Sequence, residues 1–242
     1  MTSGPTSYAH LSFNAPLSDA RANAMSVRLA AASPDTIADV GCGWAELLLR
    51  ITAAAPGARA TGIDTDAGLL DRARAAAVER GLDGRVRFLE QEAAAYDEPA
   101  DLVVCIGSTH AFGEGDGALA ALWDRVRPGG RLLLGEGFWE PTGPIDPELV
   151  WDDVLALPDL AGLVDTAVRA GFLPLWVETA TAMEWEEFES GFLADDTEWL
   201  LRHPDHARAA AVRERVDGHR TRWLRGYRHG LGFAYLTLGR PA

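Results

Sequence analysis

A regular alternation of strand-like and helix-like segments constrains the fold of this chain more than any other feature. Segments between the strand-like runs place apolar residues on one face of an amphipathic helix, and glycine or proline follows these helices. This alternation predicts an α/β fold, in which right-handed crossovers build a parallel sheet with helices on both faces. The strand-like apolar runs lie at residues 36–40, 58–64, 85–90, 101–106 and 131–135.

The C-terminal part of the chain departs from this alternation. A strand is expected over residues 172–178, with Trp176 in its core, and a final strand over residues 232–238. Between them, residues 184–198 hold seven acidic side chains and no basic one, whereas residues 202–228 hold eight arginines and three acids. An acidic helix followed by a basic helix predicts an antiparallel hairpin with complementary faces.

Composition limits the classes of partner and of chemistry. The 242 residues suit one globular domain, and the formal net charge of -14 disfavours nucleic acid or an anionic membrane as a partner. All 22 basic residues are arginine, which excludes a Schiff-base lysine and a P-loop lysine. The chain shows two cysteines, no signal peptide and no membrane-spanning apolar stretch, so we expect a soluble cytoplasmic protein without disulfides.

A glycine loop directly follows the first predicted strand. In the segment Asp39-Val40-Gly41-Cys42-Gly43-Trp44-Ala45, the glycines allow a tight turn and a close approach of the backbone to a ligand at a helix N-terminus. A dinucleotide-binding loop carries a third glycine. This chain has Glu46 there instead, and its carboxylate would repel phosphate groups. The loop therefore favours a cofactor without phosphates, and it would suit a positively charged one.

With these residues the chain resembles the class I S-adenosylmethionine-dependent methyltransferases. Their first motif, acid-x-Gly-x-Gly-x-small, matches the segment that begins at Asp39 and ends at Ala45, and their acid after the second strand matches Asp64. Gln91-Glu92 occupies the place of an acid near the adenine, and the fourth strand and the turn at residues 127–131 also look like the family. The resemblance covers roughly residues 35–240.

The resemblance implies a Rossmann-like, mostly parallel sheet of seven strands in the order 3-2-1-4-5-7-6, with an antiparallel last strand, flanking helices and a helical cap. It implies S-adenosyl-L-methionine as the cofactor and S-adenosyl-L-homocysteine as the product. Physically, a carboxylate such as Asp64 can accept hydrogen bonds from both hydroxyls of a ribose. The cofactor-binding residues that it implies are Asp39, Gly41, Cys42, Gly43, Asp64, Thr65, Gln91, Glu92 and Gly107.

A closer resemblance is to a bacterial subgroup of small-molecule methyltransferases. Its members carry a segment like residues 13–18 ahead of the sheet, Gly-Glu-x-aromatic-Trp after the fifth strand, here residues 135–139, and a long helical insertion before the last strand. This similarity implies a small-molecule acceptor. It divides the chain into an N-terminal helical cap segment, the cofactor-binding core, a helical lid insertion and the final strand, at residues 1–34, 35–179, 180–229 and 230–242.

Two side chains are candidates for removing a proton from the acceptor. His110 follows the fourth strand at its carboxyl end, the edge at which ligands bind in open α/β sheets. Histidine changes charge near neutral pH, so His110 could act as general base, or it could instead shape the pocket or cap the next turn. Glu136 ends the fifth strand and could orient His110, be the base itself, or cap the turn at Phe138-Trp139.

Aromatic residues are the candidates for holding an apolar acceptor. Trp139, Phe13 and Trp185 are the predicted acceptor-binding residues, under a helical lid. The helical spacing of Val212 and Val216 also fits simple packing. No metal is expected, because the His-Pro-Asp-His segment at residues 203–206 is explained as a helix start.

The sequence therefore predicts methyl transfer from S-adenosylmethionine to an O, N, S or C nucleophile of a small molecule by in-line displacement. One alternative is a nicotinamide-dependent oxidoreductase, which Glu46 disfavours. The other is a non-catalytic cofactor-binding protein of the same fold. Neither the acceptor nor the oligomeric state is predicted.

Overall fold

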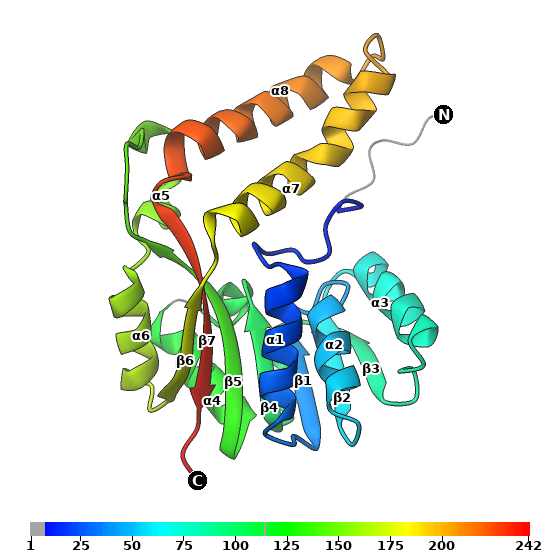
Figure 1. Ribbon diagram of the computed structural model, residues 1–242, viewed down its shortest axis with the longest axis vertical. Helices are drawn as coiled ribbons and strands as arrows, with labels where there is room; N and C mark the ends of the chain where they lie inside the picture. The colour runs from blue at the N-terminus through cyan, green and yellow to red at the C-terminus, as the bar shows by residue number, and fades with distance from the viewer. Residues whose placement is uncertain (1–7, 114) are drawn as a thin grey trace. The chain divides into compact units, whose positions relative to one another are not determined.

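The sheet has the predicted strand order. The computed structural model of the chain describes residues 8–113 and 115–242 (Figure 1). Its seven strands follow the order β3-β2-β1-β4-β5-β7-β6. The pairs β1–β2, β1–β4, β2–β3 and β4–β5 are parallel and β6–β7 is antiparallel, which confirms the predicted topology. The strands are β1 (Thr36–Val40), β2 (Arg59–Asp64), β3 (Val86–Glu90), β4 (Ala100–Ile106), β5 (Val126–Trp139), β6 (Leu173–Thr179) and β7 (Leu231–Gly239).

Local sequence signals explain where helices begin and end. The Asp66 side chain accepts hydrogen bonds from the first backbone N–H groups of α3, and Gly81 follows that helix with a φ of +67°. The helices are α1 (Asp19–Ala30), α2 (Glu46–Ala54), α3 (Ala67–Glu79), α4 (Asp116–Arg125), α5 (Asp152–Leu155), α6 (Leu160–Arg169), α7 (Ala182–Arg202) and α8 (Ala209–Thr221). Short turns are η1 (Ala93–Ala95), η2 (Thr109–Phe112), η3 (Pro147–Leu149) and the π-helical η4 (Arg222–Tyr227).

The chain divides into two compact units. The core unit contains residues 18–136, 160–179 and 234–242, and the helical unit contains the described part of residues 1–17 together with residues 137–159 and 180–233. This division differs from the predicted one in three places. Helix α1 belongs to the core unit and not to a cap segment, residues 137–159 belong to the helical unit, and so do residues 230–233.

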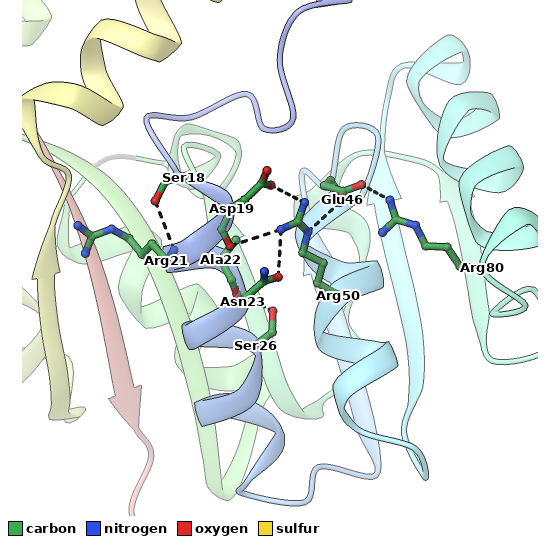
Figure 2. A network of polar contacts seen from close by, with 9 residues as sticks. All are labelled: Ser18, Asp19, Arg21, Ala22, Asn23, Ser26, Glu46, Arg50 and Arg80. Atoms are coloured by element: carbon green, nitrogen blue, oxygen red, sulfur yellow. Dashed lines mark hydrogen bonds and ion pairs between the residues drawn. The ribbon is translucent and has the colours of Figure 1, made fainter.

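A polar network fixes α1 to α2 within the core unit (Figure 2). Arg50 of α2 donates from its Nη atoms to Asp19 Oδ1 at 2.6 Å and to Asn23 Oδ1 at 3.1 Å, both on α1. The same guanidinium donates from Nε to Glu46 Oε1 at 2.8 Å. Arg80, the C-cap of α3, donates to the other oxygen of Glu46 at 2.5 Å. Three helices are therefore joined through Arg50 and Glu46.

This network corrects one premise of the sequence argument. Burial opposes the ionisation of Glu46, but hydrogen bonds and charge interactions with Arg80 and Arg50 outweigh it and lower the pKa of Glu46. Glu46 is therefore not an uncompensated charge beside the glycine loop, as the case against phosphate-containing cofactors required, because its carboxylate is paired with two guanidinium groups.

The expectation of a buried Trp176 is also wrong. Strand β6 lies at the edge of the sheet, and the Trp176 residue is 49% exposed. Its ring lies under the guanidinium of Arg28, whose central carbon is 4.5 Å from the ring centroid. Arg28 and Arg21 both pair with Glu178 on the same strand. An apolar run of this kind fits an edge strand as well as a central one.

Helices α7 and α8 form the predicted antiparallel hairpin in the helical unit. Asp196 of α7 pairs with Arg215 of α8 at 2.6 Å, and Glu186 near the start of α7 pairs with Arg228 at 2.6 Å. A small apolar core lies between the two helices, so the predicted packing face of α8 is directed at α7. This core consists of Leu193, Trp199, Ala209, Val212 and Val216.

Candidate functional site

The glycine loop crosses the end of β2. The backbone N–H groups of Gly41 and Cys42 both donate to the carbonyl of Ile63, at 2.8 and 2.9 Å. Gly41 has a φ of +75°, and a Cβ atom there would lie 2.1 Å from Ser108 Oγ, so only glycine fits. Gly43, with a φ of +54°, has open space where its Cβ would be. The loop is therefore closed against the sheet at Gly41 and open to a ligand at Gly43.

Backbone donors hold the Asp64 carboxylate at the end of β2. Its Oδ2 accepts from Gly43 N at 2.7 Å and its Oδ1 accepts from Asp66 N at 2.9 Å. Each carboxylate oxygen can accept a second hydrogen bond, so two acceptor positions remain. Thr65 is exposed beside it. This arrangement fits a vicinal diol such as that of a ribose.

The loop also carries a buried acid. Asp39 is only 5% exposed, and burial, with the nearby charge of Asp64 as a second cause, raises the pKa of Asp39 to about 8. Burial, together with the charges of Asp39 and Asp64, also raises the pKa of the Cys42 thiol, which therefore stays protonated. Two acids this close favour a positively charged ligand, because a cation would stabilise both carboxylates.

The next strands bring further predicted residues to the same edge of the sheet. Gln91 N donates to the carbonyl of Asp64 at 3.0 Å, and the exposed Glu92 begins the turn η1. Gly107 follows β4 with a φ of +65° and donates from its N–H to the carbonyl of Gly135 at 2.8 Å. The predicted cofactor-binding residues thus lie at the carboxyl ends of β1, β2, β3 and β4.

Glu136 does not end the fifth strand as predicted, because β5 continues to Trp139 and the turn expected at Phe138-Trp139 is part of the strand. The contact of Glu136 is also with a residue other than His110. The hydrogen bond that Glu136 accepts through Oε2 comes from the Thr109 hydroxyl, the residue before His110. His110 itself is exposed within η2. Thr109 was missed from the sequence, although its position three residues after the end of β4 could have indicated it, because Ile106 at that end pairs with Gly135, the residue before Glu136.

The predicted acceptor-binding residues all lie in the helical unit. Phe13 is buried, with 7% of its surface exposed, and the Trp139 ring packs on Gly230, where a Cβ would lie 2.4 Å from the ring. The indole N–H of Trp185 is buried and has no hydrogen-bond partner within residues 8–113 and 115–242. A buried donor without a partner is costly, and a bound ligand could satisfy it.

The sheet order and the glycine loop define a Rossmann-like α/β fold with its ligand-binding edge at the strand carboxyl ends. Comparisons with known proteins narrow this class. Residues 37–130 match the family model of a methyltransferase domain. YjhP of Escherichia coli is 30% identical over 211 residues, which cover 84% of this chain and 83% of YjhP. A demethylmenaquinone methyltransferase of Thermus thermophilus is 36% identical over 158 residues, which cover 63% of this chain and 70% of that enzyme.

Solved structures agree with these relatives. The X-ray structure of YjhP superposes with a TM-score of 0.82 at 26% identity, over 93% of this chain and 94% of that one. A Geobacter sulfurreducens S-adenosylmethionine-dependent methyltransferase, solved with S-adenosyl-L-homocysteine, gives 0.81 at 24% identity, over 93% and 92% of the two chains. The chain belongs to the class I S-adenosylmethionine-dependent methyltransferase family.

Family membership settles the cofactor and the reaction type. The chain is an S-adenosylmethionine-dependent methyltransferase, so the nicotinamide-dependent alternative is wrong. None of the helices in the described ranges combines the length and the apolar character needed to cross a membrane.

Proposed function

We propose that this methyltransferase acts on a small-molecule acceptor by in-line displacement, with its cofactor bound at the glycine loop and Asp64. The observation that carries this proposal is the Asp64 carboxylate, held by two backbone donors beside the raised-pKa acid Asp39. Two relatives support a small acceptor by their names, demethylmenaquinone methyltransferase and the trans-aconitate 2-methyltransferase of Streptomyces coelicolor, the latter 37% identical over 106 residues.

Residues of the core unit would bind the parts of the cofactor. Asp64 would accept hydrogen bonds from the ribose hydroxyls, with Thr65 beside it, and Gln91 and Glu92 would lie at the adenine. Gly41, Cys42, Gly43 and Gly107 would line the backbone side of the site. S-adenosylmethionine supplies a methyl group that is already activated by a positively charged sulfur, and the Asp39 carboxylate, in its deprotonated form, would favour binding of that charge.

The chain's own task in catalysis would be to place the acceptor, exclude water and take up a proton. Glu136 and His110 are the proposed proton acceptors. When the nucleophile attacks the methyl carbon, one of them would take the proton that the nucleophile releases. Thr109 would hold the Glu136 carboxylate in one orientation through its hydroxyl. Phe13, Trp139 and Trp185 are proposed to contact the acceptor, and a lid role of residues 180–229 stays a prediction.

Methyl transfer from isotopically labelled S-adenosylmethionine to a metabolite extract tests the proposal. We expect wild-type protein to produce a labelled small molecule together with S-adenosyl-L-homocysteine, detected by mass spectrometry. Glu136→Gln and His110→Gln should bind the cofactor normally, and the variant that lacks the base should form less product. Labelled product on protein or nucleic acid, with none in the small-molecule fraction, would contradict the proposal.

A further inference from the structure

A buried polar cluster links α7, α8 and the π-helical turn η4 within the helical unit. The Glu189 carboxylate, 2% exposed, accepts a hydrogen bond from the Tyr227 hydroxyl at 2.7 Å through Oε1. Its other oxygen lies 2.7 Å from His219 Nε2. The Tyr227 hydroxyl and His219 Nε2 are 3.3 Å apart. The three side chains form one hydrogen-bonded group on two helices and a turn.

The energetics of this cluster indicate a role beyond holding the hairpin together. Burying a carboxylate costs several kcal/mol, and apolar residues of similar volume often stabilise a fold as well or better. The hairpin already has an apolar core around Leu193 and Val212 and an ion pair between Asp196 and Arg215. A buried glutamate is therefore not needed to join α7 to α8.

Hydrogen bonding fixes which ring nitrogen His219 presents. Its Nε2 faces the Glu189 carboxylate, so Nδ1 is the ring nitrogen left for a ligand. The His219 side chain keeps 23% of its surface exposed, whereas that of Glu189 keeps 3%. The ring is thus the accessible member of the cluster, and Glu189 is the member that sets its orientation.

Neighbouring groups do not compete for these atoms. Burial and the charge and hydrogen bond of Glu189 raise the pKa of Tyr227, which therefore stays a neutral donor. Arg215 pairs with Asp196 and Arg220 pairs with Asp217. Arg222 lies over the Trp151 ring, 5.3 Å from its centroid.

Aromatic rings surround the exposed part of the cluster. Phe192, itself 39% exposed, lies 5.1 Å from His219 between centroids, with 31° between the ring planes. Phe188 continues the row at 6.2 Å from Phe192, and Trp151, 41% exposed, lies 5.7 Å from Tyr227. Flat apolar surfaces beside one oriented ring nitrogen fit an aromatic ring that carries a hydroxyl.

We propose that Glu189, His219 and Tyr227 form a binding site for a hydroxylated aromatic methyl acceptor. The acceptor's hydroxyl forms a hydrogen bond with His219 Nδ1, its ring packs beside Phe192, and Glu189 is a positioning residue that acts through His219. This inference rests on the proposed function, because it names the class of acceptor.

The test uses 4-fluorophenol and its near-isostere 4-fluorotoluene, which lacks the hydroxyl donor. Fluorine NMR titrations into protein saturated with S-adenosyl-L-homocysteine should show about tenfold tighter binding of the phenol, the effect of one hydrogen bond. His219→Phe should abolish this preference and Glu189→Gln should reduce it. His203→Phe is the matched control, because His203 stacks on Trp199 elsewhere in the hairpin and should keep the preference.

A second measurement does not depend on the variants folding. In wild-type protein, the ring resonances of His219, one of six histidines, should shift with 4-fluorophenol and not with 4-fluorotoluene. Equal binding of the two probes, or unmoved His219 resonances, would overturn the inference. Calorimetric titration of the same wild-type sample with S-adenosyl-L-homocysteine separates the two claims. If the cofactor product does not bind, the proposed function is refuted; if it binds but 4-fluorophenol is not preferred over 4-fluorotoluene, this site alone is refuted.

Discussion

The substitution Asp64→Asn would test the proposed cofactor site at the carboxylate that two backbone donors hold in place. In the structure both oxygens of Asp64 accept backbone N–H groups, from Gly43 and Asp66. Asparagine offers one oxygen and one NH2 group, so it can satisfy only one of these two donors. The other backbone N–H then faces a second donor, and the charge that would strengthen the proposed hydrogen bonds to the ribose hydroxyls is lost.

The expected magnitude follows from these contacts. A hydrogen bond to a charged group contributes about 1.5–3 kcal/mol. Losing the charge at both proposed ribose contacts and one of the acceptors should weaken cofactor binding by roughly 3 kcal/mol, which corresponds to about 10²-fold in Kd. The fold itself should survive, because Asp64 is partly exposed and the loop keeps its hydrogen bonds to Ile63.

Calorimetric titration with S-adenosyl-L-homocysteine gives the affinity directly. Asp71→Asn is the matched control, since Asp71 lies on α3, is 77% exposed at its side chain and pairs with Arg74. It makes the same change in charge and should bind as the wild type does. Wild-type affinity in Asp64→Asn, with unchanged thermal stability, would refute the assignment of Asp64 to the ribose.

Three further predictions concern the buried acid, the base and the helix network. The pKa of Asp39 is raised from 3.8 to about 8, so the folded state keeps this proton to a higher pH than the unfolded state does. The free energy of unfolding, measured with denaturant, should therefore fall as pH rises from about 4 to about 8. In Asp39→Asn this fall should be absent. Calorimetry should also show that S-adenosylmethionine binds more tightly, relative to S-adenosyl-L-homocysteine with its uncharged sulfur, as pH rises through about 8. A ratio of the two dissociation constants that does not change with pH would contradict the role of Asp39. Of Glu136→Gln and His110→Gln, the variant that removes the base should lower kcat by roughly 10²–10⁴-fold. Thr109→Val should lower kcat as well only if Glu136 is that base. An unchanged kcat in both Glu136→Gln and His110→Gln would show that neither side chain takes the proton. Arg50→Met should lower the free energy of unfolding in urea by roughly 1–3 kcal/mol, because it leaves the Glu46 carboxylate paired with Arg80 alone. The control Arg74→Met breaks an exposed pair and should lower it by less than about 1 kcal/mol. Equal losses in the two variants would show that the network does not fix α1.

Much of the fold could be read from the sequence, because its signals are local. The cap at Asp66 and the left-handed Gly81 each act within a few residues of themselves, and the glycine loop lies directly after β1, as predicted. Alternation of strands and helices then fixed the parallel sheet, and the family resemblance supplied the strand order. The α7–α8 hairpin could also be predicted, because the acidic block at residues 184–198 and the arginine-rich block at residues 202–228 are evident in the sequence itself.

Features that depend on tertiary register could not be read in this way. Glu46 meets Arg80 only because α3 ends beside the start of α2, and Thr109 meets Glu136 only through the pairing of β4 with β5. Trp176 sits in an apolar run that gives no sign of being an edge strand. In the hairpin, the sequence shows many acids but not that Glu189 is the one turned inward to His219.

Amide hydrogen exchange with and without S-adenosyl-L-homocysteine tests the central claim most directly, because it shows where the cofactor binds. The account predicts slower exchange at the glycine loop, Gly41–Gly43, at Asp64–Asp66, at Gln91–Ala95 and around Gly107, at the carboxyl ends of four neighbouring strands. Bound S-adenosyl-L-homocysteine that left these segments unchanged and protected others would contradict it.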